Sequence, residues 1–398
     1  MSDSLPVLRL RKNEERRLRA GHLWVFSNEV DVAQTPLTDF EPGEAVEIQD
    51  HRGAPVGSGY VNPRSLICAR LISRSARRRL DGGFLRDRLR RALALREELY
   101  GDEPFYRLAF GESDGLPGLV VDRFGDVLVA QVTTAGMDRV KDEILGALRD
   151  LLAPAGVLWR NDTANRELEG LELYVATAAG VVPEEVEIRE NGVKFIAPLA
   201  GGQKTGWFFD HRQNRERMTH YARDRRVLDV FSYIGGWGVQ AAAAGAAEVL
   251  CVDSSEGALE LAARSAALNG LEARVSTRRS DAFEALRELR DASESFDLIV
   301  LDPPAFIKRR KDARQGEKAY HRVNRLAMEL LSPGGYLVSA SCSFHFSRDE
   351  LLGTLLRASR EVGRELQILE EGHQAADHPV HPAIPETSYL KAFIARIR

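Results

Sequence analysis

Short apolar runs alternate with amphipathic segments along the C-terminal half of the chain. The runs are typical of buried strands, and the segments between them repeat apolar residues at helical spacing. The predicted strands are Val227–Phe231, Glu248–Val252, Ala273–Thr277, Phe296–Leu301 and Gly335–Ser341. The predicted helices between them are Trp237–Ala244, Ser255–Leu268, Phe283–Leu289 and Glu317–Leu331. This alternation predicts an α/β fold with a Rossmann-like parallel sheet.

The alternation stops near the C-terminus. Arg364–Leu369 and Ser388–Arg396 both have strand patterns, and no helical pattern separates them. We therefore expect the parallel sheet to be closed by an antiparallel pair of strands.

The N-terminal half is patterned differently. Residues 1–75 contain short alternating stretches broken by glycine and proline, which predict a small β-rich domain. Residues 78–100 place Arg on one helical face and Leu and Ala on the other, and Val127–Thr133 and Met137–Leu152 read as a strand and a covering helix. We predict three domains: 1–75, an α+β middle domain over 76–190, and the α/β domain over 191–398.

Composition narrows the class of protein. Hydrophobic residues make up 44% of the chain and charged residues 29%, values typical of soluble globular proteins. Its three cysteines are too few for a disulfide framework, and no apolar run is long enough to span a membrane. The N-terminal stretch Met-Ser-Asp-Ser-Leu-Pro lacks the apolar core typical of a signal peptide. We expect a cytoplasmic protein that does not associate with membranes.

Charge is distributed unevenly. The net charge is −4, yet residues 64–91 contain ten arginines and two acidic residues, a local balance of +8. Such a stripe suits phosphate contacts, and it is equally typical of a solvated helix face.

Two patterns indicate other chemistries and are set aside. Gly111-x-Ser113-x-Gly115 matches the nucleophile elbow of serine hydrolases, but a strand rather than a helix follows the serine. His373, His378 and His381 are interrupted by prolines and joined by no cysteine, so we predict no metal site.

The most informative motif follows the predicted strand Phe296–Leu301. Asp302 ends that strand, because Pro303 and Pro304 restrict the backbone after it, and Phe306 comes next. A carboxylate at the carboxyl end of a central strand lies where open α/β sheets bind ligands. Asp-Pro-Pro-x-Phe resembles motif IV of the S-adenosylmethionine-dependent methyltransferases that modify nucleobases, in which the acid hydrogen-bonds the base and the aromatic ring stacks on it. An ordinary strand-to-loop turn is the alternative.

A glycine-containing loop joins the first strand of this half to its helix. Strand-end acids accompany this loop, and together they suit a nucleotide-like cofactor. NAD fits the same pattern, but the spacing is not Gly-x-Gly-x-x-Gly, which favours S-adenosylmethionine. The predicted cofactor-binding residues are Asp229, Phe231, Gly235, Gly236, Asp253, Asp281 and Asp302.

The loop over 201–215 is rich in glycine, aromatic and polar residues and lacks the spacing of a phosphate-binding loop. We expect it to line a binding site. The predicted substrate-binding residues are Lys204, Thr205, Arg212, Pro303, Pro304 and Phe306.

Cys342 follows the fifth predicted strand and should lie beside Asp302. A thiolate there is the nucleophile needed to methylate carbon 5 of cytosine, because that carbon reacts only after addition at carbon 6. Asp302 would assist by donating to or polarising nitrogen 3 of the base. The alternative is a small buried residue, since cysteine is common in protein cores.

Several motifs in order resemble one family along essentially the whole chain. They include His-Leu-Trp-Val-Phe-Ser, Gly-Glu-Ser-Asp-Gly-Leu-Pro-Gly, Lys-Thr-Gly-Trp-Phe-Phe-Asp-His-Arg, Phe-Ser-Tyr-Ile-Gly-Gly, Asp-Pro-Pro-Ala-Phe, Ser-Cys-Ser and Gln-Ala-Ala-Asp-His-Pro. The chain is similar to the bacterial large-subunit ribosomal RNA methyltransferase I family. The resemblance implies an RNA-binding PUA domain, a class I methyltransferase domain, S-adenosylmethionine as cofactor, and 5-methylcytosine formation in 23S ribosomal RNA, free or in a large-subunit precursor particle.

The resemblance places the catalytic nucleophile at Cys342. No second cysteine accompanies Asp302, so the base that removes the carbon 5 proton is not identified, and a homodimer remains open. Three alternatives remain: the same fold acting on a guanine nitrogen, a non-catalytic RNA-binding factor in ribosome assembly, and a nicotinamide-dependent oxidoreductase.

Overall fold

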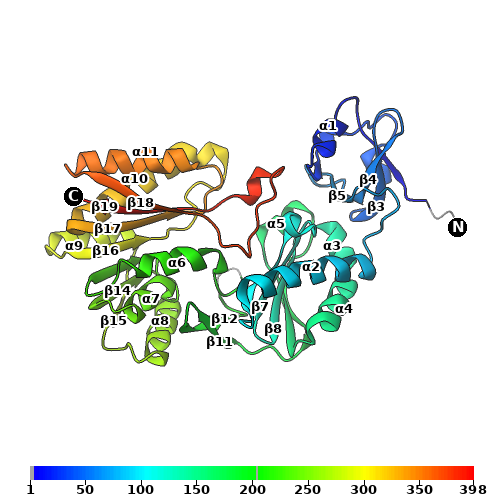
Figure 1. The fold of residues 1–398 in the computed structure, drawn as a ribbon. Coiled ribbons are helices and arrows are strands. Elements are labelled where there is room, and N and C mark those ends of the chain that lie inside the picture. The colour runs from blue at the N-terminus through cyan, green and yellow to red at the C-terminus, as the bar shows by residue number, and fades with distance from the viewer. Residues whose placement is uncertain (1–3, 203–204) are drawn as a thin grey trace. The chain divides into compact units, whose positions relative to one another are not determined.

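A seven-stranded sheet forms the centre of one of two compact units in the computed structural model, which describes residues 4–202 and 205–398 (Figure 1). Unit 1 comprises Met1–Glu184, Pro198–Trp207 and Ala376–Thr387. Unit 2, which contains the seven-stranded sheet, comprises Glu185–Ala197, Phe208–Ala375 and Ser388–Arg398.

The strands of the unit 2 sheet lie in the order β15-β14-β13-β16-β17-β19-β18. Neighbours from β15 to β17 are parallel, and β19 is antiparallel to both β17 and β18. The strands are β13 Arg226–Val230, β14 Glu248–Asp253, β15 Val275–Arg279, β16 Phe296–Leu301, β17 Leu331–Ser341, β18 Leu366–Gly372 and β19 Lys391–Ile397. The predicted α/β class and mostly parallel sheet are confirmed. β18 runs in the same direction as the parallel strands. The sheet therefore ends with one reversed strand, β19, between two strands of the common direction.

Helices cover both faces of this sheet (Figure 1). On one face, α9 (Ala282–Asp291), α10 (Ala313–Leu330) and α11 (Arg348–Glu361) share one apolar core with the strands. On the other lie α6 (Arg212–Thr219), α7 (Gly236–Ala243) and α8 (Glu256–Leu268). The central strand β16 is therefore almost wholly buried, as its apolar sequence predicts.

The helix α11 differs from the sequence prediction, which placed none between the fifth and sixth strands. It begins with a reciprocal cap: the Ser347 hydroxyl accepts from the Glu350 N–H, and the Glu350 carboxylate accepts from the Ser347 N–H. Leu351 and Leu355 lie on its buried face. Strand and helix thus alternate as far as β18.

Unit 1 contains two five-stranded sheets. The first has the order β1-β3-β4-β5-β2, and the second has the order β10-β9-β8-β7-β6. The first comprises β1 Val7–Arg9, β2 Trp24–Val25, β3 Glu44–Gln49, β4 Pro55–Val61 and β5 Ala69–Ser73, with the short helix α1 Glu15–Arg19. The second comprises β6 Phe105–Phe110, β7 Leu119–Phe124, β8 Val127–Val132, β9 Gly156–Asn161 and β10 Tyr174–Gly180. A two-stranded sheet, β11 (Glu185–Glu190) with β12 (Val193–Pro198), follows in the chain.

The helices of unit 1 refine two predictions. α2 spans Gly82–Tyr100 and starts later than expected, because the Asp81 side chain caps it by accepting from the Phe84 N–H at 2.7 Å. The covering helix is divided into α3 (Ala135–Arg139) and α4 (Lys141–Leu152). A short helix, α5 (Ala164–Leu168), follows β9.

Buried polar contacts tie the two sheets of unit 1 together. Arg70 from β5 forms an ion pair with Glu169 at 2.9 Å, and both side chains are almost fully buried. The Tyr60 hydroxyl donates to the Pro117 carbonyl at 2.7 Å. Gly136 packs so closely on Tyr60 that an added Cβ would lie 2.2 Å from its ring. A larger residue at 136 would therefore clash with the Tyr60 ring and force it or α3 to move.

Candidate active site

The centre of the unit 2 sheet is a topological switch point. β13 has β14 on one side and β16 on the other, so the loops leaving β13 and β16 diverge at the carboxyl edge of the sheet. Val230 pairs with Leu301, which in turn pairs with Ser339 on β17. The segments after β13, β16 and β17 therefore leave the sheet along one edge, where open α/β folds bind ligands.

The loop after β13 holds an unusual backbone. Phe231, Tyr233 and Gly235 all adopt left-handed conformations, with φ of 64°, 50° and 79°. For the two aromatic residues this costs on the order of 1–3 kcal/mol each, and such strain concentrates at ligand sites. The loop is held by the Ser232 N–H, which donates to the Val252 carbonyl on β14 at 3.0 Å.

Asp229 lies on β13 beneath this loop and is fully buried. One carboxylate oxygen, Oδ2, accepts from the Gly238 N–H at 2.8 Å. Oδ1 has no hydrogen-bond partner among the residues that the structure describes. Burial raises the pKa of Asp229 to about 7, although the Gly238 N–H acts in the opposite direction. A buried acceptor of this kind is available to a donor group of a ligand.

The acids that end the next two strands have defined backbone contacts. Asp253 ends β14 and accepts from the Tyr233 N–H through Oδ2 and from the Ser255 N–H through Oδ1, both at 2.9 Å. It thus fixes the loop after β13. Asp281 caps α9, with Oδ1 accepting from the N–H groups of Phe283 and Glu284.

Asp302 follows β16 and is held at both oxygens. Oδ1 lies 3.2 Å from Nε2 of His211, and Oδ2 accepts from Nε1 of Trp237 at 3.0 Å. Burial alone would raise the pKa of Asp302, but the neighbouring His211 and Trp237 together lower it below its usual value. The side chain is therefore an ionised acceptor, rather than the proton donor that the sequence left open.

Phe306 has aromatic neighbours on several sides. Its ring centre lies 4.8 Å from that of Tyr320 and 6.2 Å from those of Phe231 and Phe283. Pro303 is buried and Pro304 is exposed. Phe306 therefore links the segment after β16 to the strained loop after β13.

Cys342 comes directly after β17 and is partly exposed. Its preceding residue, Ser341, pairs with Lys391 on β19. The Lys391 ammonium donates to the Ser343 carbonyl at 2.6 Å and to the Tyr389 carbonyl at 2.9 Å. Burial lowers the pKa of Lys391 to about 8, while the charge of a Cys342 thiolate acts to raise it. A cation thus lies beside the thiol.

Hydroxyl groups fix the segment that carries Cys342. The Tyr320 hydroxyl lies 2.9 Å from both the Ser341 and Ser343 hydroxyls. Ser343 Oγ also accepts from the Ile307 N–H at 3.2 Å. The backbone on either side of Cys342 is therefore joined to the segment that follows Asp302.

The residues expected to bind substrate from the loop over 201–215 have partners within the protein. The Thr205 hydroxyl is buried in unit 1 and donates to Asp122 at 2.5 Å. Arg212, in unit 2, lies 3.7 Å from Glu190. Lys204 lies outside the described residues.

Sequence reasoning did not single out several residues of this site. His211 lies in the motif Lys-Thr-Gly-Trp-Phe-Phe-Asp-His-Arg, and Trp237 directly follows Phe-Ser-Tyr-Ile-Gly-Gly, so their positions beside these motifs are the signal that the sequence offers. Lys391 lies in the predicted strand Ser388–Arg396, where no motif marks it. Tyr389, two residues before it, donates to Asp210 at 2.5 Å.

Two further observations concern the serine-hydrolase pattern and the metal-site pattern that were set aside above. Ser113 lies in a 3-10 turn between β6 and β7, without the helix that a nucleophile elbow requires. Within residues 4–202 and 205–398, no group of three or more His, Cys, Asp or Glu side chains is arranged to hold a metal ion. In the same ranges no helix is long and apolar enough to cross a membrane.

Two family models match the chain. Residues 174–396 match the S-adenosylmethionine-dependent methyltransferase model, and residues 8–74 match a PUA-like domain. The "Ribosomal RNA large subunit methyltransferase I" of Klebsiella pneumoniae is 38% identical over 402 residues, covering 100% of both chains. That of Tolumonas auensis is 40% identical and covers 97% of this chain and 98% of its own.

Solved structures share the fold. A candidate SAM-dependent methyltransferase from Streptococcus mutans superposes with a TM-score of 0.82 at 21% identity, covering 98% of this chain and 100% of its own. Another, of a candidate methyltransferase complexed with SAH, has a TM-score of 0.84 at 21% identity with the same coverage. The resemblance noted in the sequence is thus confirmed by independent comparisons.

Proposed function

The chain belongs to the ribosomal RNA large subunit methyltransferase I family of S-adenosylmethionine-dependent methyltransferases, and we propose that it methylates carbon 5 of a cytosine in 23S ribosomal RNA. The observation that carries the choice of atom is the position of Cys342. Its thiol follows β17 at the sheet edge where β16 presents Asp302, and Lys391 lies beside it. A purine nitrogen has its own lone pair and needs no thiol, so this arrangement favours cytosine.

The proposed reaction begins with the Cys342 thiolate. It forms a bond to carbon 6 of the base, which makes carbon 5 nucleophilic. When bound, S-adenosylmethionine would supply an electrophilic methyl group, which carbon 5 would take while S-adenosylhomocysteine leaves. A base then removes the carbon 5 proton, the ring double bond re-forms, and the carbon–sulfur bond breaks to release the thiolate.

Asp302 has an orienting role in this proposal. As an ionised acceptor fixed by His211 and Trp237, it suits the exocyclic amino group of cytosine, which is a hydrogen-bond donor. Phe306, together with Pro303 and Pro304, forms the wall of the base pocket. We also propose that Thr205, Arg212 and Lys204, from the loop over 201–215, contact the RNA.

The cofactor of the family is S-adenosylmethionine, and the residues after β13 fit it. Asp229 keeps one buried oxygen without a partner among the described residues, which suits a donor group of the cofactor. Gly238 must remain small, because an added Cβ would lie 2.6 Å from the Cys251 sulfur. We assign cofactor binding to Asp229, Phe231, Gly235, Gly236, Asp253, Asp281 and Asp302.

We also propose the domain division 1–75, 76–190 and 191–398, with the first domain contributing RNA contacts. Its support is the PUA-like match over 8–74 and the separate sheets of unit 1. A ribosomal RNA substrate places the reaction in the cytoplasm, where ribosomes are assembled.

The test is transfer of a tritiated methyl group to unmodified 23S RNA, free and in precursor particles, followed by nucleoside analysis. We expect label in 5-methylcytidine with the wild type and none with Cys342→Ala. Label in a methylated guanosine would contradict the choice of atom and reduce Cys342 to a packing role. No label with either substrate would favour a non-catalytic role in ribosome assembly.

A further inference from the structure

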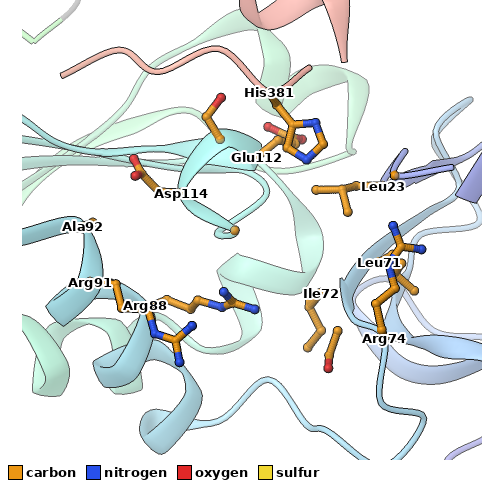
Figure 2. Close-up of a pocket in the computed structure, with 14 residues that line it drawn as sticks. Leu23, Leu71, Ile72, Arg74, Arg88, Arg91, Ala92, Glu112, Asp114 and His381 are labelled. Atoms are coloured by element: carbon orange, nitrogen blue, oxygen red, sulfur yellow. The ribbon is translucent and has the colours of Figure 1, made fainter. Parts of the chain in front are cut away.

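Unit 1 contains a cavity of about 440 Å³ that no step of the proposed reaction uses. It lies between the first sheet, the helix α2 and the 3-10 turn Gly111–Asp114 (Figure 2). In Figure 2, Arg88 and Arg91 extend from α2 on one side, and Arg74, just after β5, stands on the other. His381 closes the upper rim in that view.

The cations of the cavity are not balanced by its acids. Glu112 already accepts from the Trp24 indole N–H at 2.8 Å, and both oxygens of Asp114 accept from Arg96, at 2.7 and 2.8 Å. No ion pair to Arg74 or Arg88 is present among the described residues. Burial lowers the pKa of both guanidinium groups, so their charges are held at a cost that an anion would relieve.

Like charges lie close to Arg88 as well. Arg78 and Arg88 both stack on the ring of Phe84, at 5.5 and 5.2 Å from its centre. Arg91 shares α2 with Arg88 and contacts Asp87 at 3.1 Å at the exposed surface. Concentrated arginine charge of this kind attracts polyanions.

Ser113 provides a second, independent observation. Ser113 is one of the residues that line the cavity, and its hydroxyl oxygen is buried and has no partner among the described residues. The turn that carries Ser113 lies close to Arg88. A Cβ added at Gly115, which follows this turn, would lie 3.4 Å from the Arg88 guanidinium group. Leu23 and Ile72 supply an apolar wall.

We propose that this cavity binds the phosphodiester backbone of the RNA substrate. Phosphate oxygens accept hydrogen bonds from Arg74, Arg88 and the Ser113 hydroxyl, and the attached nucleoside rests on Leu23 and Ile72. The inference builds on the proposed RNA substrate, but it concerns binding and not the methylated atom. It gives the basic stripe over 64–91 a role and assigns Ser113 a ligand contact in place of hydrolase chemistry.

The experiment compares two arginines of one helix. Arg88 lines the cavity, whereas Arg90 is exposed on α2 outside it, so Arg88→Ala and Arg90→Ala remove the same charge. The full-length chain is titrated with unmodified 23S RNA at several salt concentrations, and Kd is measured by filter binding. We expect Arg88→Ala to raise Kd about tenfold and to reduce the salt slope by about 0.7 to 0.9, the effect of one lost phosphate contact. Arg90→Ala should change Kd less than about twofold.

Ser113→Ala tests the cavity without changing charge. It should raise Kd about threefold and leave the salt slope unchanged, because it removes one neutral hydrogen bond. Thermal unfolding of each variant checks that the fold is intact. Equal Kd values for Arg88→Ala and Arg90→Ala, or no change in either, would overturn the inference.

The result is separable from that of the methyl-transfer test. If the wild type forms no 5-methylcytidine but the Arg88 and Arg90 variants differ as expected, the reaction is wrong and the RNA site stands. If 5-methylcytidine forms and the two variants bind alike, the reaction stands and the cavity does not contact RNA.

Discussion

Nε2 of His211 lies 3.2 Å from Oδ1 of Asp302, and the two residues come from segments 91 positions apart in the chain. Trp237 donates to the other oxygen. The side-chain amide of Asn214 lies 3.2 Å from Nδ1 of His211, which orients the ring. The carboxylate that ends β16 is therefore fixed in direction and kept ionised before any substrate binds.

Removing His211 should slow methyl transfer while sparing the cofactor. In His211→Ala, Asp302 keeps one of its two partners, so the base it orients is held less well. We expect the single-turnover rate to fall about 100-fold, the order of loss for misplacement near 1 Å. S-adenosylmethionine affinity, measured by calorimetry, should change less than about threefold, because Asp302 keeps Trp237 as a partner and the other six residues assigned to the cofactor are unchanged.

His211→Gln is the matched control, since its amide can still donate to Asp302. It should recover a substantial part of the rate. An unchanged rate in His211→Ala would show that orientation of Asp302 is not limiting.

Lys391 should control the reactivity of Cys342. Burial lowers the pKa of Lys391 to about 8, so the ammonium carries its charge below that pH and loses it above. The charged groups that act on it are Cys342 itself and Glu350. Lys391→Met removes the cation and should shift the pH midpoint of Cys342 alkylation by iodoacetamide upward by about one unit.

The alkylation is followed by mass spectrometry of the peptide that contains Cys342, which separates it from Cys68 and Cys251. Lys391→Arg keeps the charge and should retain the lower midpoint. Identical profiles for the wild type and Lys391→Met would contradict a role for Lys391 in forming the thiolate.

Asp229 should make the stability of the cofactor-free protein depend on pH. Burial raises its pKa from 3.8 to about 7, so between those values the folded state keeps a proton that the unfolded state releases. The protonated Asp229 side chain therefore contributes stability to the folded state at low pH, and this contribution is lost as the pH rises from about 4 to about 7. The loss should be about 2 to 4 kcal/mol in the free energy of unfolding.

Asp229→Asn carries no charge at this position and should lack that component of the pH dependence. Urea unfolding of the wild type and the variant at pH 5 and pH 8 measures the difference. The variant should also bind S-adenosylmethionine at least about tenfold more weakly. Parallel stability curves for the two proteins would show that Asp229 is not protonated in the folded state.

The centre of the sheet was predictable because its central strands, such as β13 and β16, are almost wholly buried. Leu298–Leu301 is a continuous apolar run, and the bounds of the predicted strand that contains it, Phe296–Leu301, match β16. The helix α11 is absent from the prediction, although Leu351, Leu355 and Ala358 have helical spacing. The break between α3 and α4 has no comparable sequence signal.

Parts of the site depend on contacts that no local pattern encodes. Asp302 and Cys342 follow predicted strands, and their motifs identify them. The partners of Asp302 come from the start of α6 and from α7, and the neighbour of Cys342 comes from β19. The Thr205 hydroxyl donates to Asp122, a contact between distant segments that the glycine-rich sequence around Thr205 does not indicate.

The most direct test of the central claim is covalent trapping with RNA that contains 5-fluorocytidine. Fluorine at carbon 5 cannot leave as a proton, so the carbon–sulfur bond formed by the nucleophile cannot break after methyl transfer. With S-adenosylmethionine present, the account predicts a stable protein–RNA adduct whose peptide maps to Cys342 and which is absent in Cys342→Ala. Failure to trap the wild type in a preparation that methylates unmodified RNA, or an adduct at another residue, would contradict it.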